Sequence, residues 1–335
     1  MIITTVHAKQ ACFAARCGMA GSSRRPIKIP GVGNLKGGKS RMMNRKRTPP
    51  IVDISKCVGC GQCARVCVAC VLEMKDKKSS VAHPGWCIDC GHCAAVCPVD
   101  AVTHPAVAGP DAPKPGAKPA VTPDDLQMLL RERRSVRNYR NEPVPRDVLA
   151  RIIEAGRYAP TATNLQAVHY VVLTTKADID RLRDMTVSFY RKLFALAANP
   201  AGRAVLGLKA GREAIELLRF YGPQARHAEE LAKQGHDRLF YHAPAMIIAH
   251  SPSGDTSSCF NCAAAIYNCS LMAHTLGVGC CFNGFVVNAI VNEKKISSFL
   301  GIPPGHSCYA AMTLGYQDVK FRRLAEREPA KISWK

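Results

Sequence analysis

The chain has 335 residues, 47% of them hydrophobic, which is enough for one sizeable core and a small second domain. No stretch approaches the ~20 consecutive apolar residues that a membrane-spanning helix needs, so we expect a cytoplasmic protein with no membrane partner. The formal charge of +21 suggests nucleic-acid binding, but residues 1–50 hold 11 Lys and Arg residues and no Asp or Glu. Half of the basicity therefore belongs to this leader, and we expect no nucleic-acid partner.

Residues 1–50 show little apolar periodicity and are predicted to form a disordered leader. Four of them, Gly33, Gly38, Lys39 and Ser40, fit the phosphate-binding P-loop pattern GxxxxGK[ST]. A P-loop connects a buried strand to a helix, whereas basic and Pro-containing segments flank this one. Nucleotide binding is therefore not expected here.

Two other interpretations of the leader stay open beside disorder. Arg24 and Arg25 are similar to a twin-arginine export signal, and the acid-free composition is similar to a transit peptide, but no apolar segment follows the arginines. A start codon placed too early, with Met42 or Met43 as the true beginning, is the other possibility. We favour a disordered or artefactual leader over a targeting signal.

Residues 51–105 are organised around eight cysteines in two copies of the spacing CxxCxxCxxxC. The copies are Cys57, Cys60, Cys63 and Cys67, and then Cys87, Cys90, Cys93 and Cys97. Structural zinc sites use two separated CxxC pairs and give no reason for a CxxCxxCxxxC run. Disulfides would imply an oxidising compartment, but no secretory signal accompanies these cysteines. Iron-sulfur clusters need four thiolates each, and in the bacterial two-cluster pattern the fourth cysteine of each run binds the other cluster.

We therefore predict two 4Fe-4S clusters with crossed ligands. Cluster one is assigned to Cys57, Cys60, Cys63 and Cys97, and cluster two to Cys87, Cys90, Cys93 and Cys67. The segment resembles a bacterial two-cluster ferredoxin, although Val68 stands where the first run usually has proline, as Pro98 does in the second. His92 is interpreted as a residue at the surface or beside the cluster ligands, and not as a ligand itself.

A Pro/Ala-rich linker at residues 106–121 separates this domain from residues 122–335. Thr122 with Asp125 predicts a capped helix, and a second helix is expected at about 145–158. Further along, the pattern predicts strands at 168–174, 245–249, 278–287 and 308–315, and helices across 176–241, 263–276 and 288–300. This mixture predicts an α+β fold.

Polar and basic residues recur at the ends of these elements. RRSVR offers guanidinium groups that suit a phosphate, ATNLQ places two amides in a turn, and CFNGF brings a glycine to a strand end. His169, His250 and His274 are interpreted as structural. Cys259 and Cys262 form a CxxC pair that we expect to be packed or solvated thiols and not a redox dithiol.

Taken in order, RRSVR, APTATNLQ, the helix and strand ending in GVGCC, and LGYQ with KFRR resemble the nitroreductase family of FMN-dependent oxidoreductases. With the front domain, the chain resembles a ferredoxin-nitroreductase fusion. The resemblance implies an α+β homodimer that binds FMN at the subunit interface. It also implies FMN contacts from Arg133, Arg134, Ser135, Arg137, Asn164, Gln166, Asn283, Gly284, Lys320 and Arg323; Ala167 replaces the proline that often follows the glutamine.

The expected activity is electron transfer from a low-potential donor, an external ferredoxin or NAD(P)H, through both clusters to FMN. FMN then reduces an electron-poor small molecule of nitroaromatic or quinone type. We assign no catalytic side chain, and the sequence names neither the substrate nor the donor. The alternative is a redox-sensing or electron-carrier protein without dedicated turnover.

Overall fold

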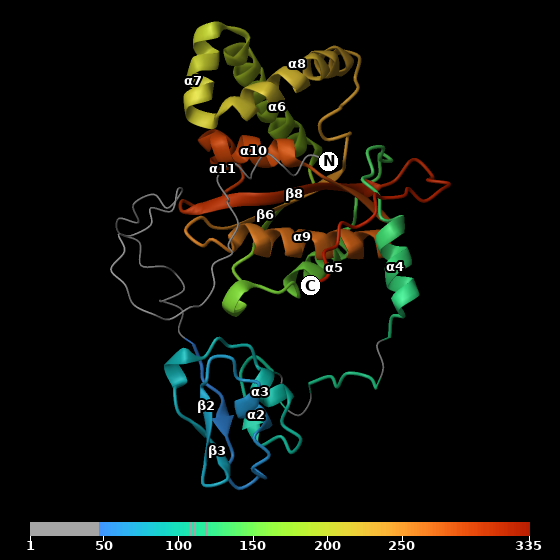
Figure 1. Ribbon diagram of the computed structural model, residues 1–335. Coiled ribbons are helices and arrows are strands. Elements are labelled where there is room, and N and C mark those ends of the chain that lie inside the picture. The colour runs from blue at the N-terminus through green and yellow to red at the C-terminus, as the bar shows by residue number, and fades with distance from the viewer. Residues whose placement is uncertain (1–46, 108, 110–111, 118–119) are drawn as a thin grey trace.

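The computed structural model of the protein describes residues 47–107, 109, 112–117 and 120–335 (Figure 1). The P-loop-like stretch, the twin arginines and Met42 and Met43 lie outside the described residues. None of the helices in the described part is long and apolar enough to cross a membrane.

The small domain consists of two similar halves. Two antiparallel pairs form its sheets: β1 (Ile51–Val52) with β4 (Val102–Thr103), and β2 (Leu72–Lys75) with β3 (Lys78–Val81). Two short helices, α2 (Gln62–Arg65) and α3 (His92–Ala95), follow the first cysteines of each run, and a 3-10 helix spans Pro84–Trp86. Gly61 and Gly91 precede these helices with φ of 71° and 72°, a left-handed conformation that glycine adopts without strain.

The large domain is a three-layer α+β structure around one antiparallel sheet (Figure 1). The strand order is β5 (His169–Leu173), β6 (Ala245–Pro252), β8 (His306–Tyr316) and β7 (Val278–Phe282). Along β6, Ile247 faces a core with α5 (Arg146–Arg157) and α9 (Ser258–Thr275), while Met246 and Ile248 face the opposite core. This alternation follows from the two-residue repeat of a strand.

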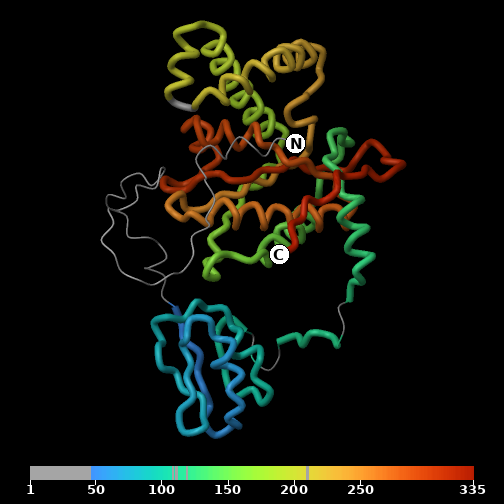
Figure 2. Tube along the Cα trace, in the orientation of Figure 1, coloured from blue at the N-terminus to red at the C-terminus, as the bar shows by residue number. Residues whose placement is uncertain are grey.

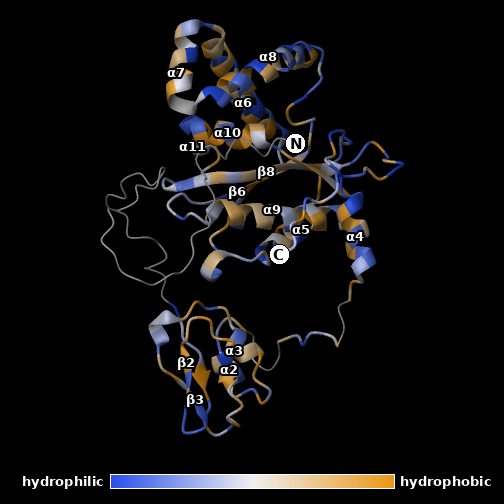
Figure 3. Cartoon of the chain, viewed as in Figure 1, coloured by the Kyte–Doolittle hydropathy of each residue, from blue (hydrophilic) through white to orange (hydrophobic). Residues whose placement is uncertain are grey.

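The second core packs α6 (Lys176–Ala198), α10 (Gly284–Asn292) and α11 (Lys294–Phe299) against the sheet. Beyond it, α6 continues into α7 (Pro200–Ala210) and α8 (Arg212–Lys233), which stand away from the sheet (Figures 1 and 2). Figure 3 colours much of α9 toward the hydrophobic end of the scale and shows hydrophilic patches on α8, as expected for a buried and an outer helix.

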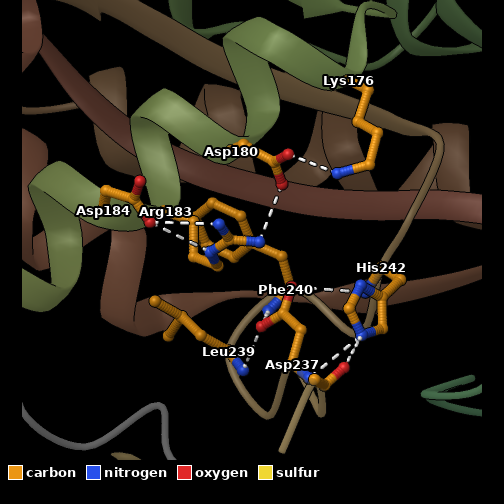
Figure 4. Close-up of polar contacts among 9 residues, drawn as sticks. Lys176, Asp180, Arg183, Asp184, Asp237, Leu239, Phe240 and His242 are labelled. Atoms are coloured by element: carbon orange, nitrogen blue, oxygen red, sulfur yellow. Dashed lines mark hydrogen bonds and ion pairs between the residues drawn. The ribbon is translucent and has the colours of Figure 1, made fainter. Parts of the chain in front are cut away.

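The loop between α8 and β6 is fixed by one carboxylate (Figure 4). Asp237 Oδ1 accepts hydrogen bonds from the backbone N–H groups of Leu239 and Phe240, both at 2.9 Å, and Phe240 is fully buried. On α6, Arg183 donates to Asp180 at 2.7 Å and to Asp184 at 3.1 Å. The Asp237 contacts hold the loop at residues 235–242 in a defined conformation, and the Arg183 contacts lie within α6.

Most predicted elements are confirmed, but some of their boundaries are wrong. Thr122 caps α4 (Pro123–Glu132), with its hydroxyl accepting from the Asp125 N–H at 3.2 Å. The strand expected at 278–287 ends at Phe282 instead. Asn283 caps α10 there, because its side-chain oxygen accepts from the Val286 N–H at 3.0 Å and starts a helix. The helix expected from residue 263 begins at Ser258.

Candidate functional site

The first three cysteines of the second run and Cys67 line one cavity. Its lining includes Cys67, Cys87, Cys90 and Cys93, the four residues assigned to cluster two. Burial, together with the neighbouring Cys90 and Cys67, raises the pKa of the Cys93 thiol to about 11. The structure therefore brings a cysteine of the first run to the second, as the crossed pattern predicts, and this all-thiol donor set fits an iron-sulfur cluster.

The first run has the same backbone geometry as the second. The Val71 N–H donates to Cys67 Sγ at 3.2 Å, and the Ala101 N–H donates to Cys97 Sγ at the same distance. The turn after Cys67 is thus built like the turn after Cys97, although Val68 replaces proline there. The pKa of Cys57 is lowered, first by the backbone N–H of Ser79 and then by that of Gly59, which favours the thiolate that binds metal.

The side chains around the two runs differ. The Cys63 thiol lies 3.2 Å from the buried Ser79 hydroxyl. Beside the second run, His104 is 4% exposed and its Nε2 lies 3.4 Å from Cys87 Sγ. His92 is exposed, in agreement with its interpretation as a non-ligand.

In the large domain, the RRSVR segment lies against the edge strand β7. The Val136 N–H donates to the Cys280 carbonyl at 2.9 Å, and Ser135 pairs with Cys280 as a short parallel bridge. Gly279 permits this approach, because a Cβ there would lie 2.8 Å from Val136 Cγ2. The backbone contact thereby fixes the three residues that carry the phosphate prediction, Arg133, Ser135 and Arg137.

The Arg133 side chain supplies a buried donor. Within the described part of the chain, its Nε has no hydrogen-bond partner and almost no exposure to water. A buried cationic donor without a partner is costly, and an anionic phosphate would satisfy it. This observation fits the FMN phosphate. The Arg137 guanidinium carbon lies 6.0 Å from the centre of the Tyr241 ring.

Asn283 and Gly284 also lie at the end of β7. The backbone N–H of Asn283 donates to the Ala311 carbonyl at 2.9 Å. Its Nδ2 donates to the Leu239 carbonyl at 2.7 Å and so ties the 235–242 loop to α10. Gly284 is exposed in the first turn of α10, where a helix leaves N–H groups without an intrahelical partner.

Lys320 and Arg323 lie in the irregular segment after β8, and both are exposed. This segment approaches RRSVR through Phe321, whose ring lies 5.2 Å from the Arg134 guanidinium carbon. Phe321 follows Lys320 directly and stands two residues before Arg323, so its contact brings the segment that carries these two predicted FMN contacts to Arg134.

Asn164 and Gln166 lie in a constrained turn before β5. Thr163, Asn164 and Gln166 have φ of 48°, 53° and 49°, left-handed values that are uncommon outside glycine. The turn is supported by Asn261, whose side-chain oxygen accepts from the Ala162 N–H at 3.1 Å, and by Thr161, which accepts from the Gln166 N–H at 3.0 Å. This turn precedes β5, whereas RRSVR lies against β7, and β5 and β7 are the opposite edges of the sheet.

The same turn contacts the small domain. Asn164 Nδ2 donates to the Asp89 carbonyl at 2.7 Å and to the Ile88 carbonyl at 3.2 Å, and Asn164 Oδ1 accepts from Gln166 Nε2 at 3.1 Å. Ile88 and Asp89 stand between Cys87 and Cys90. A predicted flavin residue is thus hydrogen-bonded to the loop that borders the cluster-two cavity.

Three further side chains, which the sequence did not predict as site residues, are characterised by their contacts. Tyr241 reaches Arg137 from the 235–242 loop, and no motif marks it. His250 lies within 5.3 Å of His169 and 5.1 Å of His306, ring centre to ring centre. Cys262 is buried and its pKa is raised to about 12 by burial, which agrees with a packed thiol and not a redox dithiol.

Comparisons with known proteins agree with this division of the chain. The profile of the nitroreductase family matches residues 130–316, and that of a 4Fe-4S dicluster domain matches residues 56–102. Among solved structures, a nitroreductase with bound FMN from Bacteroides fragilis NCTC 9343 is 22% identical, with a TM-score of 0.45, over 63% of this chain and 99% of its own. One with bound FMN from Desulfitobacterium hafniense DCB-2 is 19% identical, with a TM-score of 0.44, over 62% and 97%.

Among curated proteins, the NADH dehydrogenase of Thermus thermophilus is 42% identical over 60 residues. Those residues are 18% of this chain and 29% of that protein, so the match spans less than a third of the relative.

Proposed function

The chain belongs to the nitroreductase family of oxidoreductases and carries a 4Fe-4S domain in front, and we propose that this domain supplies electrons to an FMN bound by the family domain. Electrons from a low-potential donor would pass through two 4Fe-4S clusters to FMN. From FMN they would pass to an electron-poor small molecule of nitroaromatic or quinone type.

The hydrogen bonds from Asn164 to Asp89 and Ile88 carry this proposal. They join the loop between two cluster-two ligands to the turn that the family uses near the flavin ring. Electron transfer slows steeply with distance, so a direct contact between these segments is what a relay requires. The alternative, a redox sensor or carrier without dedicated turnover, predicts that no nitroaromatic or quinone compound reoxidises the reduced flavin.

A homodimer follows from the position of the two flavin segments. RRSVR lies on the β7 edge and the Asn164 turn lies on the β5 edge, with β6 and β8 between them. The two segments are also offset along the sheet, because His169 aligns through His250 with Cys308 whereas Cys280 aligns with Leu314, six residues or roughly 20 Å further along β8. The turn would therefore complete a site on a second protomer. The small domain of one protomer would then serve the flavin held by its partner.

Each cofactor has protein groups that fit it. Cys57, Cys60, Cys63 and Cys97 would hold cluster one, and Cys67, Cys87, Cys90 and Cys93 would hold cluster two. Arg133, Ser135 and Arg137 would bind the FMN phosphate, with Arg134, Lys320 and Arg323 adding positive charge, and Gly284 would allow close approach at the end of β7. When bound, the clusters transfer single electrons and FMN stores two for delivery as hydride.

The donor is an external ferredoxin-like carrier or NAD(P)H. The described chain supplies the relay and the flavin site in either case, and the two donors differ in whether electrons arrive at the clusters or at the flavin. Reduction of the clusters by the physiological carrier before the flavin would identify the first route.

Composition of the anaerobically purified protein tests the proposal. We expect about eight iron atoms and eight sulfides per chain, from two four-iron clusters, with one FMN per chain. A screen of nitroaromatic and quinone compounds should then find at least one that reoxidises the flavin. Zinc in place of iron, or FMN-free protein that cannot be reconstituted, would refute it.

A further inference from the structure

We propose that His104 donates an N–H···S hydrogen bond to Cys87 and thereby raises the reduction potential of cluster two relative to the same cluster without this bond. The inference rests on the proposed function only in requiring that both clusters are bound. It concerns a residue outside the cysteine pattern, in the segment that leaves the small domain toward the linker.

Contacts of the imidazole determine which nitrogen carries the proton. His104 Nδ1 accepts a hydrogen bond from the Ala106 N–H at 3.0 Å. In a neutral imidazole that accepts at Nδ1, the proton must lie on Nε2. His104 Nε2 lies 3.4 Å from Cys87 Sγ, within hydrogen-bond distance of a sulfur acceptor, so the N–H is directed at the ligand atom.

The position of His104 is also defined by packing. The side chain is 4% exposed and lines the same cavity as Cys67, Cys87, Cys90 and Cys93. The Val107 N–H donates to the His104 carbonyl at 2.9 Å, which closes a turn around the residue. Gly91 lies under this turn, since a Cβ there would lie 2.6 Å from Val107 Cγ2. The turn therefore holds the imidazole against the cavity wall.

The hydrogen bond would increase the affinity of cluster two for an electron, and it requires no transfer of the proton on His104. When cluster two gains one electron, negative charge on its sulfur ligands increases, and a donor directed at one of them stabilises the reduced state more than the oxidised state. No bond breaks and no proton leaves His104. Hydrogen bonds to sulfur are among the factors that set cluster potentials.

The two halves of the small domain differ at this point. The backbone N–H groups directed at Cys67 and Cys97 are equivalent, but the residue 30 positions before His104 is Met74, which has no N–H on its side chain. Cluster one instead has the Ser79 hydroxyl at Cys63. A change at His104 should therefore affect one cluster, and the other provides an internal reference.

Redox titration of the holoprotein, followed by electron paramagnetic resonance, tests the proposal. We expect His104→Leu to weaken the affinity of cluster two for an electron about tenfold, a shift of ~59 mV for a one-electron couple, and to leave cluster one unchanged. His104→Asn, which keeps an N–H donor, should recover part of the shift. His92→Leu is the matched control, because His92 adjoins Cys93 but is exposed.

Iron and sulfide counts accompany each variant. An unchanged potential of cluster two in fully loaded His104→Leu protein, or an equal shift of both clusters, would overturn the proposal. Loss of cluster two from both His104 variants would assign the residue to packing and would overturn it as well. These outcomes are independent of whether the clusters reduce the flavin, so they do not depend on the relay itself.

Discussion

At the scale of single residues, side chains outside the cysteine pattern connect the two domains and complete the site. Asn164 donates to the small domain and accepts from Gln166, and Asn283 holds both a helix and a loop. Sequence predicted Asn283 as a site residue, but it could not show that the Ala311 carbonyl already takes its backbone N–H. Tyr241 and Asp89 carry no motif, since their roles come from contacts between distant segments.

Arg133 should dominate phosphate binding among the basic residues, because its Nε is buried without a partner in the described part of the chain. Replacing Arg133 by Gln should weaken FMN binding by about 10- to 100-fold, the loss of a charge-assisted hydrogen bond worth about 1.5–3 kcal/mol. Fluorescence titration of the FMN-depleted protein measures this. Arg131→Gln is the control, because Arg131 is bonded to the exposed Glu326; equal losses in both variants would contradict the assignment.

His250 should make stability depend on pH. Burial, with His306 and His169 nearby, lowers its pKa from 6.5 to about 4. The unfolded chain takes up this proton near pH 6.5 and the folded protein only near pH 4, so stability is lost as the pH falls between these values. The loss should approach about 3 kcal/mol, from 1.36 kcal/mol per pKa unit.

Thermal unfolding followed by helix circular dichroism at pH 7 and pH 5 measures the effect. His250→Gln should flatten the pH dependence, and His274→Gln should keep it, since His274 is partly exposed beside Glu132. An identical pH dependence in wild type and His250→Gln would exclude His250 as the source.

At the scale of elements, the position of RRSVR depends on a strand as much as on its own arginines. Sequence predicted the helix that precedes RRSVR, because Thr122 and Asp125 form a local cap. It placed the end of β7 five residues too late, because GFVV suits a strand or a helix and only the Asn283 cap decides between them. The sequence therefore predicted an element boundary correctly where the capping residue was recognised, as at Thr122, and wrongly where it was not, as at Asn283.

Gly279 tests this dependence directly. In Gly279→Ala, the new Cβ would meet Val136 at 2.8 Å, so RRSVR must move away from β7. We expect a loss of about 1–3 kcal/mol of stability and weaker FMN binding. Gly254→Ala is the control, because nothing lies within 4 Å of a Cβ there. Unchanged melting and FMN affinity in Gly279→Ala would show that the contact is dispensable.

At the scale of the whole molecule, the small domain and the large domain, which a linker separates in the sequence, are in contact at the Asn164 turn. Composition predicted the linker and the spacing predicted two clusters, but no pattern in the sequence indicated which cysteine run contacts the nitroreductase-family domain. That information is in the hydrogen bonds from Asn164 to the loop between Cys87 and Cys90.

Replacing Asn164 by Asp should release this contact, because the new carboxylate would face the Asp89 carbonyl without a donor. We expect a larger radius of gyration in small-angle X-ray scattering, with full iron content. Asn292→Asp is the matched control, since among the described residues the Asn292 amide donates to Asn288 in the same helix, α10. A scattering profile identical to that of wild type would place the docking elsewhere.

The relay is tested most directly by anaerobic stopped-flow spectroscopy of the holoprotein mixed with reduced methyl viologen, a one-electron carrier. We predict that the clusters bleach first and that flavin reduction follows at a rate independent of carrier concentration. This phase should be absent from Cys90→Ser protein that retains FMN. Bleached clusters beside a flavin that stays oxidised, or flavin reduction that is equally fast in the variant, would contradict the account.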